Sequence, residues 1–526
     1  MITQGNNRNL GDPLTEPALQ DKDGMSSNNP ENGRGRTDGK SGVGLVHSRV
    51  NAVGNHSERK QICAVCGKSN PLEGTDSHTE CNKETSTILR DGEKTETKLL
   101  HITEVSKDKP GYRFTSLASL LNKEYLTSCY KELKKGRAPG ADGVSVEEYG
   151  KKLSENIDGL ISRMKRMSYR PQAVRRAYIP KENGSKRPLG IPSVEDKIVQ
   201  KAIAGILEAI FEPGFLASSY GFRKGISQHD ALSRIDKVVT GKPINYVIDA
   251  DIKGFFDNVE HKWMVKFLEH RIGDKNLIRL IVRFLKSGIM EQGKYWETEK
   301  GTPQGGIISP ILSNIYLHYV LDLWIEKKVK KECRGYVELT RYADDFIICV
   351  ENKEEAYKIL EALGERLNKF GLTLSEEKTR IVGFGRTTGK EEKPNTFDFL
   401  GMTHFNDRTR QGYYKLGRKT SKKKFRMKMQ AMNEWLKEVR CRLSPEEIWK
   451  VMKAKLIGHY RYYGVSGNYR MIAKYNYNAI RKLFYWLNRR SQRRNINWES
   501  FRKYLKKYPL PSPKIYVNLY TLAPHK

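Results

Sequence analysis

The sequence lacks long hydrophobic runs, and for its size it has few cysteines and few acidic residues. No stretch of about 18 apolar residues occurs, which excludes an obvious membrane-spanning helix, and the N-terminus has no signal-peptide core. Seven cysteines scattered over 526 residues do not form the dense pattern of a disulfide scaffold. We therefore expect a soluble, cytoplasmic protein with no membrane partner.

The shortage of acidic residues leaves a large positive charge. The chain has 95 lysines and arginines against 61 acids, a formal charge of +34, which indicates a polyanionic partner. From Gln411 to the end there are 29 lysines and arginines against 5 acids, together with 20 of the 51 aromatic residues. Basic groups neutralise phosphates and aromatic rings stack on unpaired bases, so this region predicts an RNA-binding surface. A short basic run such as residues 422–424 would alone indicate only a solvated face.

Two adjacent carboxylates, Asp344 and Asp345, stand between β-favouring apolar residues in residues 340–350. This pattern predicts a β-hairpin with both acids at its turn. Two like charges so close repel each other unless a cation lies between them. One interpretation is a solvated turn, and the other is a metal-dependent polymerase site.

A third carboxylate, Asp251, comes where an apolar strand over residues 245–250 ends. Nucleotidyl transfer uses two divalent ions held by carboxylates, and Mg²⁺ prefers hard oxygen ligands. Asp249, two residues earlier, would point the same way but deeper, where a backbone or lysine contact is the better interpretation.

Further sequence blocks accompany these acids in a fixed order. They are residues 185–192 (SKRPLGIP), 219–223 (SYGFR), 301–310 (GTPQGGIISP), 342–345 (YADD), 371–379 (GLTLSEEKT) and 399–401 (FLG). With the strand that ends at Asp251, they resemble a bacterial group II intron-encoded protein, a reverse transcriptase with maturase activity, from about residue 112 to the C-terminus. The resemblance implies an α+β fold of the right-hand polymerase type: fingers and palm with a small antiparallel sheet, then an α-helical thumb with maturase domain X. A disordered N-terminal region would precede it.

The resemblance also implies roles for residues of the catalytic site. Asp251, Asp344 and Asp345, with the carbonyl of Ile252, would bind two Mg²⁺ ions and carry catalysis. The nucleotide-binding residues would be Lys181, Arg187, Phe256, Gln304 and Lys378. Arginine suits this task because its planar fork meets phosphate oxygens in pairs. Phe256 would exclude ribonucleotides by bulk, with Phe255 as the alternative.

The implied partners are group II intron RNA, target DNA and deoxynucleoside triphosphates, and the protein would act as a monomer or dimer, near the nucleoid when on DNA. The candidate RNA contacts are basic residues: Arg137, Lys422, Lys423, Arg461, Arg489, Arg490, Arg493 and Arg494. Many relatives continue into a Cys/His-rich endonuclease domain. Because the last cysteine is Cys441, we expect that domain to be absent.

The predicted domain boundaries follow composition and the blocks. Residues 1–110 would be a mostly disordered extension, because they are polar and poor in large apolar residues. The remaining segments are an N-terminal extension of the reverse transcriptase (111–170), fingers and palm (171–410), thumb and domain X (411–490), and a basic C-terminal tail with a DNA-binding role (491–526).

A pair of ligand-like motifs interrupts the polar N-terminal region. Cys63 and Cys66, followed by His78 and Cys81, have the close paired spacing that a tetrahedral zinc site needs. Almost no hydrophobic residues surround them. The alternative is unligated thiols in a flexible segment.

The predicted function is an RNA-directed DNA polymerase and intron maturase that binds its intron RNA, assists splicing and copies the intron into cDNA during retrohoming. One alternative is a non-intron bacterial reverse transcriptase of the retron or antiphage type. The other is an RNA-binding splicing factor without polymerase activity.

Overall fold

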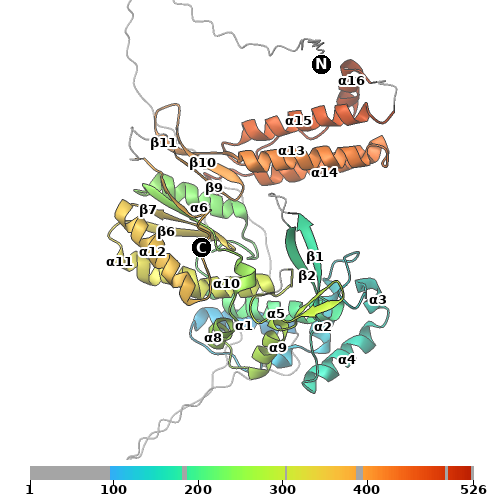
Figure 1. The fold of residues 1–526 in the computed structure, drawn as a ribbon, viewed down its shortest axis with the longest axis vertical. Coiled ribbons are helices and arrows are strands. Elements are labelled where there is room, and N and C mark those ends of the chain that lie inside the picture. Colours follow the sequence, from blue (N-terminus) through green and yellow to red (C-terminus); the bar gives the residue numbers. More distant parts are fainter. Residues whose placement is uncertain (1–94, 181–185, 303–304, 387–394, 492–495, 523–526) are drawn as a thin grey trace, which may run out of the picture. The chain divides into compact units, whose positions relative to one another are not determined.

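The computed structural model describes residues 95–180, 186–302, 305–386, 395–491 and 496–522. These residues all belong to one structural unit of the chain. They form a mixed α and β fold in which small sheets are followed by a helical C-terminal region (Figure 1). The α+β class predicted from the sequence is therefore confirmed. Among the described residues, no helix is both long and apolar enough to cross a membrane.

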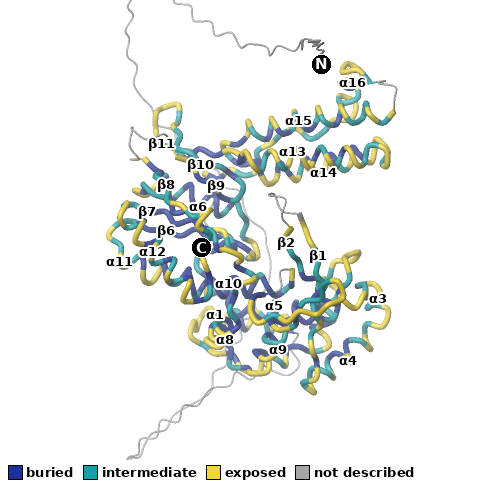
Figure 2. Tube along the Cα trace, viewed as in Figure 1, coloured by how far each residue is buried: buried dark blue, intermediate teal, exposed yellow. Residues whose placement is uncertain are grey.

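The central sheet is antiparallel, with the strand order β6, β7, β3, β8. The strands are β3 (Tyr246–Ala250), β6 (Val337–Tyr342), β7 (Asp345–Val350) and β8 (Arg380–Gly383). Successive side chains of a strand point to opposite faces, so Ile348 joins one hydrophobic core and Ile347 the other. Helix α12 (Lys353–Lys369) packs against β3 and β7, and α6 (Gln228–Gly241) packs against β6. The sheet is consequently buried along most of its length (Figure 2).

A group of helices around α5 forms the core on one side of the sheet. Helix α5 (Val194–Phe211) begins at Ser193, whose side chain accepts a hydrogen bond from the backbone N–H of Asp196. Its neighbours include α1, α2 and α10. The helices of this region are α1 (Thr95–Asp108), α2 (Lys123–Lys131), α3 (Val146–Gly150), α4 (Leu153–Lys165), α7 (Phe255–Asn258), α8 (His261–Glu269), α9 (Lys275–Leu285), α10 (Ser309–Leu317) and α11 (Lys330–Glu332). Short 3₁₀ turns are η1 (Leu117–Leu120) and η2 (Glu212–Gly214).

Between α10 and α11 the chain continues as two π-helical segments. They are η3 (His318–Asp322) and η4 (Ile325–Val329). A π-helix is rare and usually occurs as a single widened turn, often near a functional site.

A second sheet has the order β2, β1, β4, β5. Its strands are β1 (Val174–Pro180), β2 (Lys186–Ile191), β4 (Ile289–Glu291) and β5 (Lys294–Trp296). The pairs β1–β2 and β4–β5 are antiparallel, whereas β1 and β4 run parallel. This sheet is therefore mixed. Its two parallel strands, β1 and β4, are connected by a long stretch of chain and not by a hairpin.

The C-terminal region begins with a three-stranded antiparallel sheet in the order β11, β10, β9. The strands are β9 (Thr396–Phe399), β10 (Met402–Arg408) and β11 (Tyr414–Thr420). Helices α13 (Lys422–Val439), α14 (Pro445–Tyr463) and α15 (Tyr469–Leu487) follow, and α15 packs against both others (Figure 1). The helical spacing over residues 421–463 and 468–494 predicted these helices.

Helices lie near both ends of the described chain. Helix α1 lies inside the stretch 1–110 for which we expected a mostly disordered extension; its Ile102 is buried and its Ser106 donates a hydrogen bond to the carbonyl of Ile210. In the segment 491–526, expected as a tail, helix α16 (Trp498–Lys507) forms and Leu519 is fully buried. The apolar residues of these segments gain their partners only from distant parts of the chain. Residues 1–94, including all four predicted zinc ligands (Cys63, Cys66, His78 and Cys81), lie outside the described residues.

Candidate active site and nucleic-acid interface

The two adjacent carboxylates lie at the turn of the hairpin between β6 and β7, as the sequence predicts. Tyr342 pairs with Asp345 across the hairpin, which leaves Ala343 and Asp344 as the turn. Ala343 adopts the left-handed conformation with φ of 59°, which a short turn between paired strands requires. Asp344 is half-buried and Asp345 is exposed.

Asp251 lies beside this turn because β3 pairs with β7 next to it. Ala250 is opposite Phe346 in this antiparallel pair, so Asp251, which follows the end of β3, reaches the same edge as Asp345, which begins β7. The block of residues 371–379 flanks Asp251. The backbone N–H of Ser375 donates a hydrogen bond to the backbone carbonyl of Asp251 at 2.8 Å. The Nζ atom of Lys378 donates to the carboxylate of Asp251 at 2.7 Å.

The electrostatics of the three carboxylates favour a bound cation. Although part of Asp345 reaches solvent, the protein atoms packed around its carboxyl group desolvate it and raise its pKa to about 6, and the negative charges of Asp344 and Asp251 raise it further. Burial likewise raises the pKa of Asp344, with repulsion from Asp251 adding to it. Because charged carboxylates are disfavoured here, a cation between them would relieve both their repulsion and their poor hydration.

The carboxylates do not already enclose a metal site. Within the part of the chain that the structure describes, no set of three or more His, Cys, Asp or Glu side chains is arranged to hold a metal ion. Asp251 is instead turned toward Lys378. Three hard oxygen donors on one edge of a sheet nevertheless fit Mg²⁺, which keeps part of its coordination shell for water or substrate.

Asp249, on the same strand, is engaged elsewhere. Its carboxylate pairs with the guanidinium of Arg380 at 3.2 Å. We expected a contact with a lysine or the backbone, so the observed partner is a different one. The pairing with Arg380 is consistent with a role for Asp249 that differs from that of Asp251.

The structure describes three of the five predicted nucleotide-binding residues, Arg187, Phe256 and Lys378. Arg187 is exposed on β2, and its charge lowers the pKa of Asp344, which brings it into the same electrostatic field. Lys181 and Gln304 lie outside the described residues. Lys378 is held by Asp251.

Phe255 and Phe256 differ in burial, which bears on the choice between them. Phe255 is 2% exposed and packs edge-on against Tyr316. Phe256 is half-buried and lines a cavity of about 360 Å³ together with Gly190 and Thr302. Phe256 is therefore the one that a ligand can reach.

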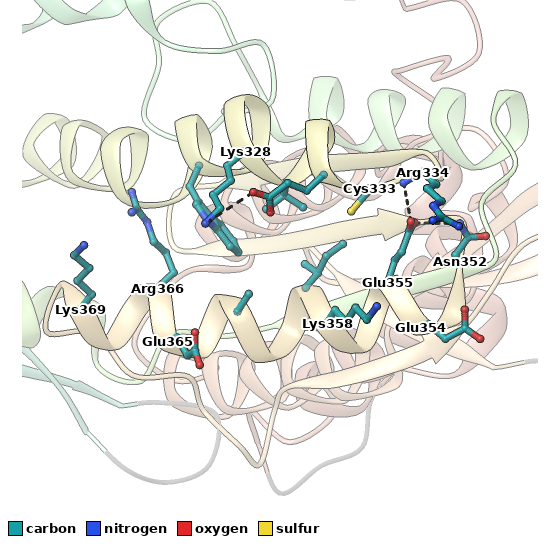
Figure 3. A pocket seen from close by; sticks show the side chains of 15 residues that line it. Lys328, Cys333, Arg334, Asn352, Glu354, Glu355, Lys358, Glu365, Arg366 and Lys369 are labelled. Carbon is teal, nitrogen blue, oxygen red and sulfur yellow. Dashed lines mark hydrogen bonds and ion pairs between the residues drawn. The ribbon is translucent and has the colours of Figure 1, made fainter.

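Another cavity, of about 880 Å³, lies between the η4 to α11 segment and α12 (Figure 3). It is lined by charged side chains of both signs, and Glu355 accepts hydrogen bonds from the backbone N–H of Arg334 and from the side chain of Asn352. None of the predicted catalytic carboxylates lines it. We therefore place the candidate active site at the hairpin edge, where the perturbed carboxylates are, despite the larger volume here.

The helical region presents basic and aromatic side chains along one face of α15. The opposite face is buried through Ile472, Tyr475, Ala479 and Leu483. The exposed residues recur every three or four positions, so they form one stripe that continues into the turn after the helix. This α15 stripe contains Arg470, Lys474, Tyr477, Arg481 and Tyr485 of α15, and Arg489 of the turn. The guanidinium of Arg489 lies 3.6 Å from the ring centre of Tyr485, and that of Arg481 lies 5.6 Å from the ring centre of Tyr477.

The basic residues predicted from the sequence as RNA contacts have different environments. Those that are exposed are Arg137, Lys422, Lys423, Arg461 and Arg489. Arg490 is half-buried and donates to the carbonyl of Leu443 at 2.8 Å, so part of its function is to join α15 to the start of α14. Arg493 and Arg494 lie outside the described residues. The sequence reasoning missed Arg470, Lys474, Tyr477, Arg481 and Tyr485, which the helical period of basic and aromatic residues could have found.

Comparisons with known proteins agree with this arrangement. Residues 179–404 match the family model described as reverse transcriptase (RNA-dependent DNA polymerase). Over 343 residues the chain is 34% identical to the group II intron-encoded protein LtrA of Lactococcus lactis subsp. cremoris, covering 54% of this chain and 57% of that protein. It is 32% identical over 310 residues to the protein YkfC of Escherichia coli (strain K12), covering 53% of this chain and 79% of YkfC. A putative COX1/OXI3 intron 1 protein of Saccharomyces cerevisiae is 29% identical over 358 residues, covering 59% of this chain and 42% of that protein.

The matched family model spans the central sheet and all three carboxylates, and it includes the second sheet from the last two residues of β1 onward. The chain therefore belongs to the reverse transcriptase family, and it is similar to a protein that a group II intron encodes. The matched part of the chain spans 57% of the length of LtrA.

Proposed function

We propose that the protein is an RNA-directed DNA polymerase and intron maturase that binds its group II intron RNA, assists splicing and copies the intron into cDNA during retrohoming. The observation that carries this proposal is the meeting of Asp251, Asp344 and Asp345 at one sheet edge within a reverse transcriptase family match. The proposed partners are intron RNA, target DNA and deoxynucleoside triphosphates.

The right-hand architecture is part of the proposal. The sheet of β3, β6, β7 and β8 would be the palm, and the sheet of β1, β2, β4 and β5 the fingers. Helices α13, α14 and α15 would be the thumb with domain X, and residues 111–170 the N-terminal extension. The C-terminal segment beyond residue 490 would contact DNA, which its basic composition supports.

Asp251, Asp344 and Asp345, with the carbonyl of Ile252, would hold two Mg²⁺ ions. When bound, such ions lower the pKa of an attacking 3′-hydroxyl and stabilise a leaving pyrophosphate. The guanidinium of Arg187 would pair with triphosphate oxygens, because its planar fork matches them. Lys378 would leave Asp251 and turn its ammonium group toward the phosphates. Gln304 would lie near the incoming sugar, and Lys181 would add a second cation for the triphosphate.

Phe256 is proposed as the group that excludes ribonucleotides. Replacing Phe256 with valine removes bulk beside the sugar, so we expect discrimination against ribonucleotides to fall by about 10-fold to 100-fold. Competition between a ribonucleotide and the matching deoxynucleotide in primer extension measures this ratio. Phe255→Leu is the matched control: it should lower the melting temperature, because Phe255 is buried, and leave sugar discrimination unchanged. The opposite pattern would assign the sugar contact to Phe255.

The raised pKa of Asp345 predicts how cDNA synthesis depends on pH. Because the carboxyl takes up its proton near pH 6, we expect synthesis at low Mg²⁺ to fall as the pH drops through about 6. A metal competes with that proton, so saturating Mg²⁺ should move the midpoint to lower pH. Primer-extension rates from pH 5 to 8 at low and high Mg²⁺ test this, and a midpoint that ignores Mg²⁺ would contradict it.

The α15 stripe supports the maturase part of the proposal. Basic groups that alternate with exposed aromatic rings suit phosphates and unpaired bases of a folded RNA. Binding there would stabilise the ribozyme for splicing without using the catalytic carboxylates.

Primer extension on an RNA template with deoxynucleotides and Mg²⁺ tests the polymerase, and splicing of the RNA that flanks the gene tests the maturase. DNA product together with protein-dependent splicing supports the full proposal. Product without splicing indicates a reverse transcriptase that serves another RNA. Splicing without product indicates an RNA-binding splicing factor.

A further inference from the structure

Arg341 is a fully buried arginine three residues before Asp344, and all five of its N–H groups are hydrogen-bonded. Its Nε and Nη2 atoms bind the two carboxylate oxygens of Asp322 at 2.7 and 2.6 Å. Nη2 also donates to the hydroxyl of Ser219 at 2.7 Å, and Nη1 donates to the side chain of Asn314 at 3.1 Å. The fifth bond goes from Nη1 to the carbonyl of Ala343, at 3.0 Å.

The bond to Ala343 is the one that bears on the catalytic site. Ala343 is the left-handed residue of the turn that carries Asp344. The other four hydrogen bonds fix the position of the Arg341 guanidinium. Because its five donors have a rigid fork geometry, the fixed guanidinium holds the carbonyl of Ala343 in one position. Asp322 makes the pair electrically neutral, so the main effect of Arg341 is geometric.

Residues 219–223, a block that the proposed mechanism does not use, form the other half of this support. The backbone N–H of Arg341 donates to the carbonyl of Ser218, and that of Tyr220 donates to the carbonyl of Arg341, both at 2.8 Å. Gly221 lies directly against the turn: a Cβ atom at this position would lie 2.2 Å from the backbone nitrogen of Ala343. Only glycine permits so close an approach.

Two further elements keep the support in place. Asn314 on α10 also donates to the carbonyl of Gly221, at 2.8 Å, so it joins Arg341 to the glycine. Asp322 ends the π-helical segment η3, whose widened turn presents its carboxylate to Arg341. Burial lowers the pKa of the adjacent His318 to about 4, so this imidazole is neutral and Arg341 is the charge partner of Asp322.

We infer that Arg341, held by Asp322, Ser219 and Asn314, is a positioning residue: it fixes the Ala343–Asp344 turn in one conformation and thereby raises the affinity of the carboxylates for a divalent metal. The inference rests on the proposed polymerase function only for its consequence in synthesis. Its direct expression is the affinity of the three carboxylates for a divalent cation. Groups that orient metal ligands typically change metal affinity by about 10-fold to 100-fold when they are removed.

The test measures Mn²⁺ binding to the full-length protein by the electron paramagnetic resonance signal of free Mn²⁺. The difference between wild type and Asp344→Ala/Asp345→Ala defines the carboxylate site. Arg341→Lys keeps the charge but loses the fork, and it should weaken binding at this site about tenfold. The matched control is Arg418→Lys: Arg418 is also buried and pairs with an aspartate, Asp236, but its other hydrogen bond goes to Ser466. It should bind Mn²⁺ as the wild type does.

Synthesis provides a second readout that a purely structural role would not change in the same way. In primer extension, Arg341→Lys should raise the Mg²⁺ concentration for half-maximal rate about tenfold, and excess Mg²⁺ should restore most of the rate. RNA affinity should stay at the wild-type value. Unchanged Mn²⁺ affinity in a folded Arg341→Lys protein would overturn the inference.

Ser219→Ala decides the question if Arg341→Lys does not fold. This change removes one of the five hydrogen bonds of Arg341 and leaves a buried donor unpaired, so it should weaken Mn²⁺ binding about threefold and lower the melting temperature by a few degrees while the protein still folds. Wild-type affinity in this variant would then overturn the inference. A wild-type protein that binds Mn²⁺ at the carboxylates but makes no cDNA would refute the polymerase proposal alone.

Discussion

Replacing both Asp344 and Asp345 with alanine is expected to abolish cDNA synthesis and to leave RNA affinity unchanged. Both carboxylates lie at the hairpin turn, and their pKa values are raised by desolvation first and by repulsion between the acids second. Bound metal stabilises the charge of a nucleotidyl-transfer transition state by several kcal/mol, so its loss should lower the rate by about a thousandfold or more. The proposed RNA-binding surface, the α15 stripe, contains neither carboxylate.

Primer extension and filter binding of the same RNA measure the two properties on one preparation. Asp249→Asn is the matched control. It removes a carboxylate of β3, two residues before Asp251, and this carboxylate is paired with Arg380. It should keep most of the activity. Equal losses of synthesis and RNA binding in the double variant would refute the division of labour between the hairpin and the helical region.

The sequence could predict the hairpin and the position of Asp251 because both depend on local patterns. β-favouring residues on both sides of Asp344 and Asp345 define paired strands, so the two acids fall at the turn between them. The placement of Asp251 at a strand end follows from where the apolar run stops. These features need no knowledge of distant contacts.

Other features of the site depend on residues far apart in the chain, and the sequence could not fix them. The pair of Lys378 with Asp251 joins residues 127 positions apart. Four of the five hydrogen bonds of Arg341 go to three distant residues, Asp322, Asn314 and Ser219. The choice between Phe255 and Phe256 stayed open for the same reason, because packing against Tyr316 buries Phe255.

The nucleic-acid surface shows the limit of choosing residues by charge alone. The basic composition favoured Arg490 as an RNA contact, but Arg490 donates a hydrogen bond to the carbonyl of Leu443. The helical period of α15 would have drawn attention to Arg481 instead, which stands exposed beside Tyr477. Periodicity therefore separates the solvent face from the helix contacts better than composition does.

Replacing Arg481 and Arg489 with alanine should weaken RNA binding about tenfold or more and make it less sensitive to salt. Each arginine that contacts a phosphate releases about 0.7 to 0.9 counterions, so the slope of log affinity against log salt should become shallower by about 1.5. Loss of the guanidinium planes beside Tyr477 and Tyr485 also removes stacking partners for bases. Binding of the intron RNA measured over a range of salt concentrations gives both quantities.

The matched control removes the same charge from the same helical region. Arg442 and Lys503 are exposed, and each is already paired with a glutamate, Glu438 and Glu499 respectively. Replacing both with alanine should leave the affinity and the salt slope near the wild-type values, because a paired cation has less to gain from a phosphate. If the control weakens binding as much as the stripe variant, RNA affinity depends on net charge alone. If only the stripe variant loses affinity, the ordered face of α15 is the binding surface, and splicing should fall with it while primer extension on a short template persists.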